Sequence, residues 1–214
     1  MRFDPDILNL QFDFDPFCKF WLPFLKYGAE QSKIWDQSGN GNHGVISGAV
    51  PAISVDEEFG WYFDGSDDRV VHPAINLGKL HTLNYWIKRI GDNGNVHAGG
   101  LTYCGLRISD TTVGYSSAST VAETHNGPAS TAKKTLISIT RILDKVNFFQ
   151  DGLHIGEEQT LEQSDNLTLT DFGRYSNGTD YFNGVIYQAV GYTRIFPAVE
   201  IKNYYEMTRL ILGA

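Results

Sequence analysis

Acidic and histidine side chains are the residues of this chain that could do chemistry, and their spacing limits that chemistry. Hydrolysis of a glycosidic bond requires two carboxyl groups held a few ångströms apart. The densest acidic run, Asp56, Glu57 and Glu58, is contiguous and lacks the spacing that would place its members on one face of a strand. Two further acidic positions, Glu157 and Glu162, border an expected turn. These patterns favour solvated loop acids, and we expect a protein without enzymatic activity.

The histidines and serines point the same way. None of the six histidines is placed at the H-x-H or H-E-x-x-H spacing of zinc sites, and no G-x-S-x-G elbow occurs. Oxygen ligands are better represented, so calcium is the more plausible metal. The run D-Q-S-G-N-G-N-H-G at residues 36–44 and the run F-D-G-S-D-D-R-V-V at residues 63–71 carry the candidate ligands Asp36, Asp64 and Asp67, with Asp68 beside them. Aspartates in such turns also bond their own backbone, so turn capping is an equal alternative.

Two long polar segments are candidates for ligand recognition. Residues 91–100 and 116–132 are rich in glycine, serine, threonine and asparagine, and the second is longer than a connector in a compact domain requires. Their amide, imidazole and phenol groups suit hydrogen bonding to, and stacking on, a sugar. The predicted ligand-contacting residues are Asn95, His97, Tyr103, Tyr115, His125 and Asn126. A plain surface loop or a subunit contact is the alternative, and the four tryptophans stand in strand-like contexts typical of a core.

Short strands joined by turns account for most of the chain. Alternating or apolar runs predict strands at residues 20–25, 60–63, 69–72, 80–90, 101–108, 112–115, 135–143, 146–150, 153–155 and 184–192. Asp151 and Gly152 form the two-residue turn expected of a β-hairpin. After Pro197 the apolar spacing changes to that of a helix, with Glu200 near its start and Arg209 near its end, as the helix dipole favours. We expect this helix to pack on an edge of a β-sandwich.

The first sixteen residues differ from the rest of the chain. Residues 1–16 alternate aromatic and acidic side chains and contain two prolines, which predicts an extended N-terminal arm preceding a single domain at residues 17–214. Phe3, Phe12 and Phe14 are predicted to contact another subunit. The alternative is that the arm forms a short edge strand on its own domain.

The composition of the chain limits the kinds of partner that we expect it to bind. The net charge of −8 and the sequence pI near 5.1 argue against nucleic acid and anionic membranes, which attract basic surfaces. No window reaches the roughly 18 consecutive apolar residues of a membrane helix, and the first residues lack the pattern of a signal peptide. Cys18 and Cys104 are the only cysteines, and we expect both to be reduced. The expected site of synthesis is therefore a cytoplasm.

The two turns resemble those of the concanavalin-A-like lectin/glucanase superfamily, specifically its laminin-G-like jelly-roll domains. There a D-x-S-G-N-G-N-x-G turn precedes an F-D-G-x-D-D/N-x-V turn, as at residues 36–44 and 63–71. The final strand and helix are also similar, over residues 182–204. The resemblance implies an all-β, two-sheet antiparallel jelly-roll sandwich with one C-terminal helix. Calcium-binding members place an aspartate where this chain has Tyr187, and the E-x-D-x-x-E triplet of the glucanases is absent.

The resemblance also implies a function. The segment E-I-K-N-Y-Y-E-M-T-R at residues 200–209 looks like the tail of stand-alone, phage-encoded members. It implies a structural or adhesion protein of a virus particle, a head or tail accessory, decoration or spike, located on the virion and acting outside the cell. Its partners would be other virion proteins or its own copies, as a homo-oligomer, and surface glycans. The alternative is a carbohydrate-binding domain that works alone or beside an enzyme.

Overall fold

The computed structural model describes residues 15–24, 32–52, 60–91, 94–99, 103–109, 112–117, 120–124, 133–162, 165–174 and 180–212. The predicted arm contacts Phe3, Phe12 and Phe14 lie outside these residues. In chain order the strands are β1 (Cys18–Pro23), β2 (Lys33–Ile34), β3 (Gly44–Ser47), β4 (Val50–Pro51), β5 (Trp61–Asp64), β6 (Arg69–Gly78), β7 (Leu80–Arg89), β8 (Gly94–Gly99), β9 (Tyr103–Ile108), β10 (Val113–Ser117), β11 (Thr120–Thr124), β12 (Thr135–Ile142), β13 (Lys145–Gln150), β14 (Leu153–Thr160), β15 (Leu167–Phe172) and β16 (Asn183–Tyr192). The helix is α2 (Ala198–Leu212).

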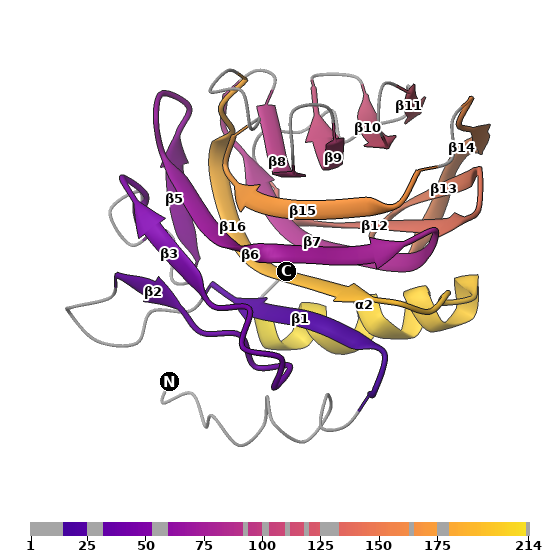
Figure 1. Cartoon of the computed structure of the whole chain (residues 1–214), viewed down its shortest axis with the longest axis horizontal. Coiled ribbons are helices and arrows are strands. Elements are labelled where there is room, and N and C mark those ends of the chain that lie inside the picture. Colours follow the sequence, from indigo (N-terminus) through magenta and orange to yellow (C-terminus); the bar gives the residue numbers. More distant parts are fainter. Residues whose placement is uncertain are drawn as a thin grey trace.

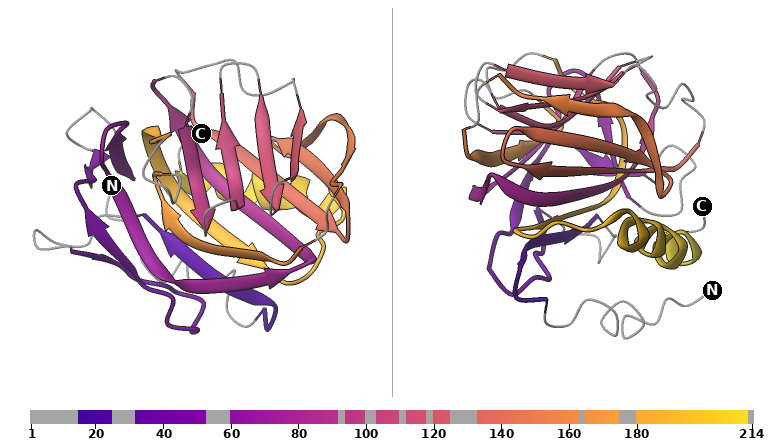
Figure 2. Two further views of the ribbon diagram at one scale, coloured as in Figure 1. Left: turned by 45° about the horizontal axis from the view of Figure 1, so that its top comes forward. Right: turned by 90° about the vertical axis from the view of Figure 1, so that its right-hand side faces the viewer.

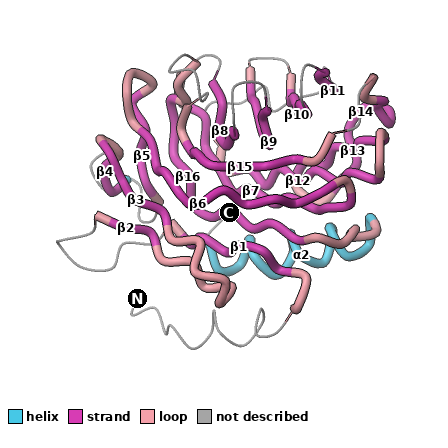
Figure 3. Tube along the Cα trace, viewed as in Figure 1, coloured by secondary structure: helices cyan, strands magenta, loops and turns pink. Residues whose placement is uncertain are grey.

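The strands form two antiparallel sheets that face each other (Figures 1 and 3). Sheet A has the order β14-β13-β12-β7-β16-β5-β4, with β1 also paired to β16. Sheet B has the order β11-β10-β9-β8-β15-β6-β3-β2. The expected two-sheet antiparallel sandwich with one C-terminal helix is confirmed.

The main hydrophobic core fills the space between the two sheets. Leu83, Tyr85 and Ile87 of β7 share the inward face, as their alternation predicts, and each is at most 1% exposed. Phe172 of β15 and Val70 of β6 meet them from sheet B. Each strand of the two inner faces therefore contributes alternate residues to one core.

A second core lies on the other side of sheet A, beneath α2. Trp86 donates from Nε1 to Thr208 Oγ1 at 2.8 Å and stacks on Tyr205, with ring centroids 5.7 Å apart. Tyr204 donates to Gln188 Oε1 at 3.1 Å. The helix thus covers the outer face of sheet A, as Figure 2 shows, and not an edge of the sandwich as the sequence suggested. The central strands of sheet A are consequently buried on both faces.

Most predicted strands are present, but two strands lie in segments interpreted as loops. β8 falls within residues 91–100 and β11 within residues 116–132. β8 was missed because of its glycines, and β11 because it lies in a polar segment. The glycines of β8 allow a close approach to the neighbouring strand. A Cβ at Gly99 would lie 1.9 Å from the Thr168 carbonyl oxygen of β15, so only glycine fits there.

The hairpin at Asp151 and Gly152 is confirmed. Both residues have positive φ, 49° and 80°, as a two-residue turn of type I′ requires. The Asp151 carboxylate also accepts a hydrogen bond from the Leu136 amide at 3.0 Å, which ties the turn to β12. Because a Cβ at Gly152 would lie 3.1 Å from Lys202 Cα, the turn sits directly against α2.

We expect Gly152→Val to lower the free energy of unfolding by more than ~1 kcal/mol, because valine at positive φ is strained and its side chain would press on α2. Gly78→Val is the matched control, since Gly78 has φ 67° but a Cβ added there would meet no atom within 4 Å. Urea unfolding of both variants measures the difference. A loss no larger at Gly152 than at Gly78 would contradict the close docking of the helix on this turn.

Candidate ligand-binding surface

The outer face of sheet B carries an exposed aromatic and aliphatic surface around Trp35. We call Lys33, Trp35, His43, Val45 and Val71 the Trp35 surface. Trp35 is 49% exposed, Val45 50% and Val71 37%. The rings of Trp35 and His43 meet edge to face with centroids 4.7 Å apart, and Lys33 Nζ lies 5.9 Å from the Trp35 ring.

Strand register places these residues together. Lys33 of β2 is opposite Val45 of β3, and Val45 is opposite Val71 of β6. Their neighbours Ile34 and Val70 point the other way and are buried in the main core. Because successive side chains of a strand alternate between faces, burial of one set forces the other set into solvent.

The loop that follows Trp35 is held rigidly by one carboxylate. Asp36 Oδ1 accepts from the amides of Trp21 and Ser38 at 2.9 and 3.0 Å. Asp36 Oδ2 accepts from the Asn42 amide at 2.8 Å and from Ser38 Oγ at 2.9 Å. These four bonds use the roughly four acceptor positions of a carboxylate. Asp36 is therefore a turn-forming residue, which is the alternative that the sequence analysis gave for it, and its role as a calcium ligand stays a prediction.

Amide side chains attach the same loop to β1. Asn40 Nδ2 donates to the Cys18 carbonyl oxygen at 2.8 Å, and Asn42 Nδ2 donates to the Lys19 carbonyl oxygen at 2.7 Å. Gly39 and Gly41 supply positive φ, 82° and 75°. The glycine- and asparagine-rich run at residues 36–44 thus forms an ordered turn against β1. This turn fixes the backbone that directly follows Trp35.

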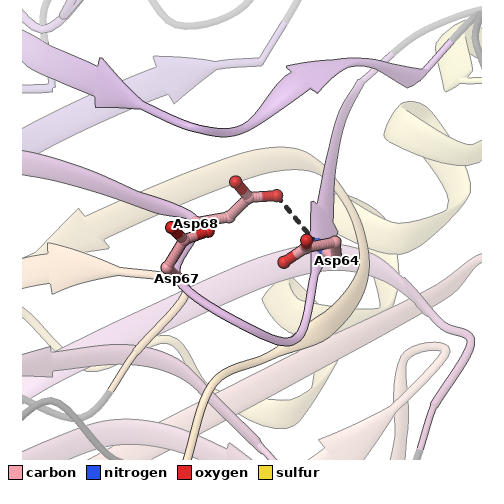
Figure 4. Close-up of side chains that lie close together, drawn as sticks. All are labelled: Asp64, Asp67 and Asp68. Carbon is pink, nitrogen blue, oxygen red and sulfur yellow. Dashed lines mark hydrogen bonds between the residues drawn. The ribbon is translucent and has the colours of Figure 1, made fainter.

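The second acidic turn gathers three carboxylates. Asp64, Asp67 and Asp68 offer oxygen atoms that all lie within 4.8 Å of one another (Figure 4). Asp68 Oδ2 accepts from the Asp64 amide and Asp64 Oδ1 from the Ser66 amide, both at 2.8 Å. Burial, opposed by the bond from the Asp64 amide, raises the pKa of the Asp68 carboxyl, and the charges of Asp64 and Asp67 raise it further.

These three residues fit a cation such as Ca²⁺. Calcium–oxygen distances of about 2.3–2.6 Å allow two ligand atoms to lie up to about 5 Å apart, and the carboxylate repulsion would be relieved by a positive charge. Asp64 and Asp67 are exposed, and exposed acids of a turn also cluster without an ion. Of the predicted ligands the structure brings Asp64 and Asp67 together with Asp68 and leaves Asp36 outside the cluster.

Two residues predicted to contact a ligand are in the interior. His97 and Tyr115 are each 0% exposed, so neither can meet a ligand at the surface, and this part of the prediction is corrected. His97 Nε2 lies 2.8 Å from His72 Nε2, and His97 Nδ1 lies 2.8 Å from the Tyr85 hydroxyl. His72 Nδ1 faces the Pro73 carbonyl oxygen at 2.8 Å and must donate to it. If both imidazoles are neutral, all three hydrogen bonds have one donor and one acceptor. His97 then donates from Nε2 to His72 Nε2, and the Tyr85 hydroxyl donates to His97 Nδ1.

Tyr115 belongs to a similar buried network. Arg141 NH1 donates to the Tyr115 hydroxyl at 2.9 Å, and that hydroxyl lies 3.1 Å from His81 Nε2. The Arg141 side chain is itself fully buried. Tyr115 stands on sheet B, whereas Arg141 and His81 stand on sheet A, so the network joins the two sheets across the core. Tyr85 and His97 join them in the same way.

The other predicted ligand contacts are only partly placed. Asn95 lies in β8 and Tyr103 in β9, neighbouring strands of sheet B, but their side chains lie outside the described structure. His125 and Asn126 lie outside the described residues altogether. Whether these four residues contact a ligand stays a prediction.

Trp35 was not among the sequence candidates, because it was interpreted as a core tryptophan. The signal that identifies it is local. Its neighbours Ile34 and Asp36 are both buried, and Asp36 is also hydrogen-bonded to β1. Because side chains alternate between the two faces of an extended chain, the Trp35 side chain between them is exposed to solvent.

Comparisons with known proteins match the fold, but no family model and no curated sequence. No model of a known protein family matches the chain. Nor does any curated protein match at significant similarity. Among solved structures the chain is similar to the receptor-binding domain of a botulinum neurotoxin C/D mosaic serotype, with TM-score 0.67 and 13% identity over 91% of this chain and 52% of that one. It is also similar to the botulinum neurotoxin serotype D binding domain, with TM-score 0.66 and 14% identity over 90% of this chain and 52% of that one.

Trypanosoma rangeli sialidase in complex with sialic acid is a further structural neighbour, with TM-score 0.66 and 16% identity over 92% of this chain and 34% of the sialidase. The chain therefore spans about half of the toxin chains and a third of the sialidase chain. At this identity the likeness establishes the fold alone. It agrees with the two-sheet antiparallel β-sandwich that the strand pairing shows. Within the described residues no helix has the length and hydropathy needed to cross a bilayer.

Acid is expected to destabilise this protein through its buried histidines. Burial lowers the pKa of His72 to about 4 and that of His81 to about 3. The charge of Arg141 also lowers the pKa of His81. Burial lowers the pKa of His97 well below its usual range. Below pH ~6.5 the unfolded chain binds protons that the folded chain does not, so stability is lost as the pH falls from ~6.5 towards 4. Urea unfolding at several pH values measures this loss, which is expected to reach several kcal/mol.

His154→Gln is the control for this pH dependence, because His154 is exposed on β14 and lies outside both buried networks. The variant is expected to keep the wild-type slope of stability against pH. A wild-type stability that does not change between pH 6.5 and 4.5 would contradict the neutral, buried state of His72, His81 and His97.

The two acidic turns are expected to differ in how their stability responds to loss of a carboxylate charge. Asp36→Asn replaces an acceptor oxygen by a donor facing other donors, so we expect a loss of about 1–3 kcal/mol in the free energy of unfolding. Asp68→Asn keeps an acceptor for the Asp64 amide and removes a carboxylate whose pKa is raised, so stability at pH 7 in chelator should not fall. Equal losses in both variants would show that Asp68 is also a turn-forming carboxylate.

Proposed function

We propose that this chain is a non-enzymatic recognition domain that binds carbohydrate on the Trp35 surface. The observation that carries the proposal is Trp35 itself, a half-exposed aromatic ring on a loop whose carboxylate and amide groups are already engaged with β1. An aromatic face with a few well-placed polar groups is the usual composition of a small-ligand site. The C–H-rich face of a sugar ring can stack on such a π-surface.

Polar groups for sugar hydroxyls stand beside the ring. His43 Nδ1 accepts from the Asp36 amide at 3.0 Å, so in the neutral imidazole Nε2 carries the proton and is a donor. Lys33 Nζ supplies further donors near the ring. Because the turn is fixed by internal hydrogen bonds, binding would require little ordering of the protein, which favours affinity.

The structural neighbours support a binding role. One is the receptor-binding domain of a botulinum neurotoxin mosaic serotype, another is the binding domain of botulinum neurotoxin serotype D, and a third is a sialidase in complex with sialic acid. The non-enzymatic form of the proposal rests on the sequence, which lacks the E-x-D-x-x-E triplet of the glucanases. Since the chain matches only part of each neighbour, the activities of those whole proteins are not transferred.

The finer form of the proposal is a laminin-G-like protein of a bacteriophage particle, a head or tail accessory, decoration or spike that acts on the virion surface. Its support is the sequence resemblance at residues 36–44, 63–71 and 200–209. Its partners would be other virion proteins or further copies of this chain. A virion protein is expected to copurify with assembled particles, whereas a free-standing lectin is not. Copurification therefore distinguishes the two forms of the proposal.

Glycan arrays followed by calorimetry test the binding role. We expect a glycan to bind the wild-type protein and Trp35→Ala to weaken that binding at least ~10-fold, equivalent to about 1.4 kcal/mol, with Trp35→Tyr intermediate. Leu153→Ala is the matched control, since Leu153 is 64% exposed but stands on β14 of sheet A. Glycan binding that Trp35→Ala leaves unchanged, or no binding to any glycan, would contradict the proposal.

A further inference from the structure

Two polar side chains lie buried in the layer between sheet A and α2. Asn84 of β7 is 1% exposed and Ser138 of β12 is 0% exposed. In the part of the chain that the structure describes, no group bonds to Asn84 Oδ1, Asn84 Nδ2 or Ser138 Oγ. The two residues are direct partners in the register of β7 with β12. Three unpaired polar atoms from neighbouring strands therefore lie close together in the interior.

Both side chains face α2 and not the main core. The residues on either side of Asn84, and those on either side of Ser138, belong to the core between the two sheets. These flanking residues are Leu83, Tyr85, Ile137 and Ile139. Because successive side chains of a strand point to opposite faces, Asn84 and Ser138 point to the outer face of sheet A, which the helix covers.

The chain is attached to β7 on both sides of Asn84. Trp86, the next residue of β7 on the outer face, donates from Nε1 to Thr208 Oγ1 of α2 at 2.8 Å. Thr82, the preceding residue on this face, accepts at Oγ1 from the amide of Phe196, two residues before α2 begins, at 2.9 Å. The segment from Phe196 to Thr208 therefore passes over Asn84, on the side of sheet A where Figure 2 shows the helix.

The side chains next to this pair offer no polar group. Val190 of β16 is the register partner of Asn84, and Phe149 of β13 is the register partner of Ser138. Both belong to the second, apolar core beneath α2. Leaving three polar atoms unpaired in such surroundings is costly, and buried polar groups of native proteins are nearly always hydrogen-bonded to protein or to ordered water.

The donors and acceptors of the pair define the ligand that fits. The Asn84 amide offers one acceptor oxygen and a donor NH₂ group, and the Ser138 hydroxyl can donate or accept. A cation would bond only to the oxygens and face the amide donor, while an anion would leave Asn84 Oδ1 unpaired. Water donates and accepts at once, and buried waters typically make about three hydrogen bonds to groups of this kind.

We propose that at least one internal water molecule binds between Asn84 and Ser138, beneath α2. It bridges β7 and β12 from the helix side and pairs polar atoms that the surrounding apolar side chains leave free. This site lies on the outer side of sheet A, whereas the Trp35 surface lies on the outer side of sheet B. The inference therefore does not depend on carbohydrate binding.

A crystal structure at a resolution that shows ordered waters tests the site directly. We expect a water within hydrogen-bond distance of Ser138 Oγ and of the Asn84 amide group in the wild-type protein. The double variant Asn84→Leu with Ser138→Ala, which removes both partners, is expected to lose that water. A direct hydrogen bond between Asn84 and Ser138, or a wild-type site without water, overturns the inference.

A double-mutant cycle tests the same site in solution. We expect Asn84→Leu and Ser138→Ala each to lower the melting temperature by a few degrees, and the double variant to lose less than the sum, because both singles remove a partner of the same water. Ser116→Ala is the matched control, since Ser116 is a buried serine of sheet B and its effect should simply add to that of Asn84→Leu. A melting temperature raised by Asn84→Leu alone overturns the inference, because apolar replacement stabilises only where the amide has no partner to lose.

Discussion

Strand β16 is the element on which most of the remaining structure depends, because it is paired along both edges and buried on both faces. β7 lies along one edge, while β5 and β1 share the other. Its inward residues, including Ile186 and Ala189, belong to the core between the sheets, and Val185, Tyr187 and Val190 belong to the core under α2. The N-terminal strand β1, the strands β5 and β7, and the C-terminal helix therefore all pack on one strand near the end of the chain. This arrangement makes the fold rich in contacts between residues distant in sequence, which favours slow folding.

Polar groups inside the main core restrict how the two sheets can be placed. Tyr85 and His97 form one hydrogen bond between the sheets, and Tyr115 bonded to Arg141 forms another. An apolar sandwich core tolerates small shifts of one sheet on the other, whereas these pairs are satisfied in a single relative position. Leaving any one of them unpaired in the dry interior is costly. The networks therefore specify the alignment of the sheets more than they add to net stability.

Local turn chemistry made much of the fold predictable from the sequence. Asp151 with Gly152 identified a hairpin, and the apolar spacing after Pro197 identified α2, because both signals reside in adjacent residues. β8 was not predicted, since the close approach of β15 requires glycine where a strand normally carries a side chain. β11 was not predicted either, because this short strand lies in a segment rich in polar residues. The burial of His97 and Tyr115 was also not predictable. Their partners, His72, Tyr85, His81 and Arg141, are 12 to 34 positions away in the chain, and single-sequence patterns do not show which strands meet.

The unequal exposure of the four tryptophans has a spectroscopic consequence. Trp21, Trp61 and Trp86 are each at most 3% exposed, whereas Trp35 is 49% exposed and lies against the imidazole of His43. Three indoles in dry surroundings emit at shorter wavelength, and the fourth supplies the red-shifted emission that a soluble quencher such as iodide can reach. The quenchable fraction of the fluorescence is therefore an intrinsic reporter of a single loop, read without any label attached to the protein.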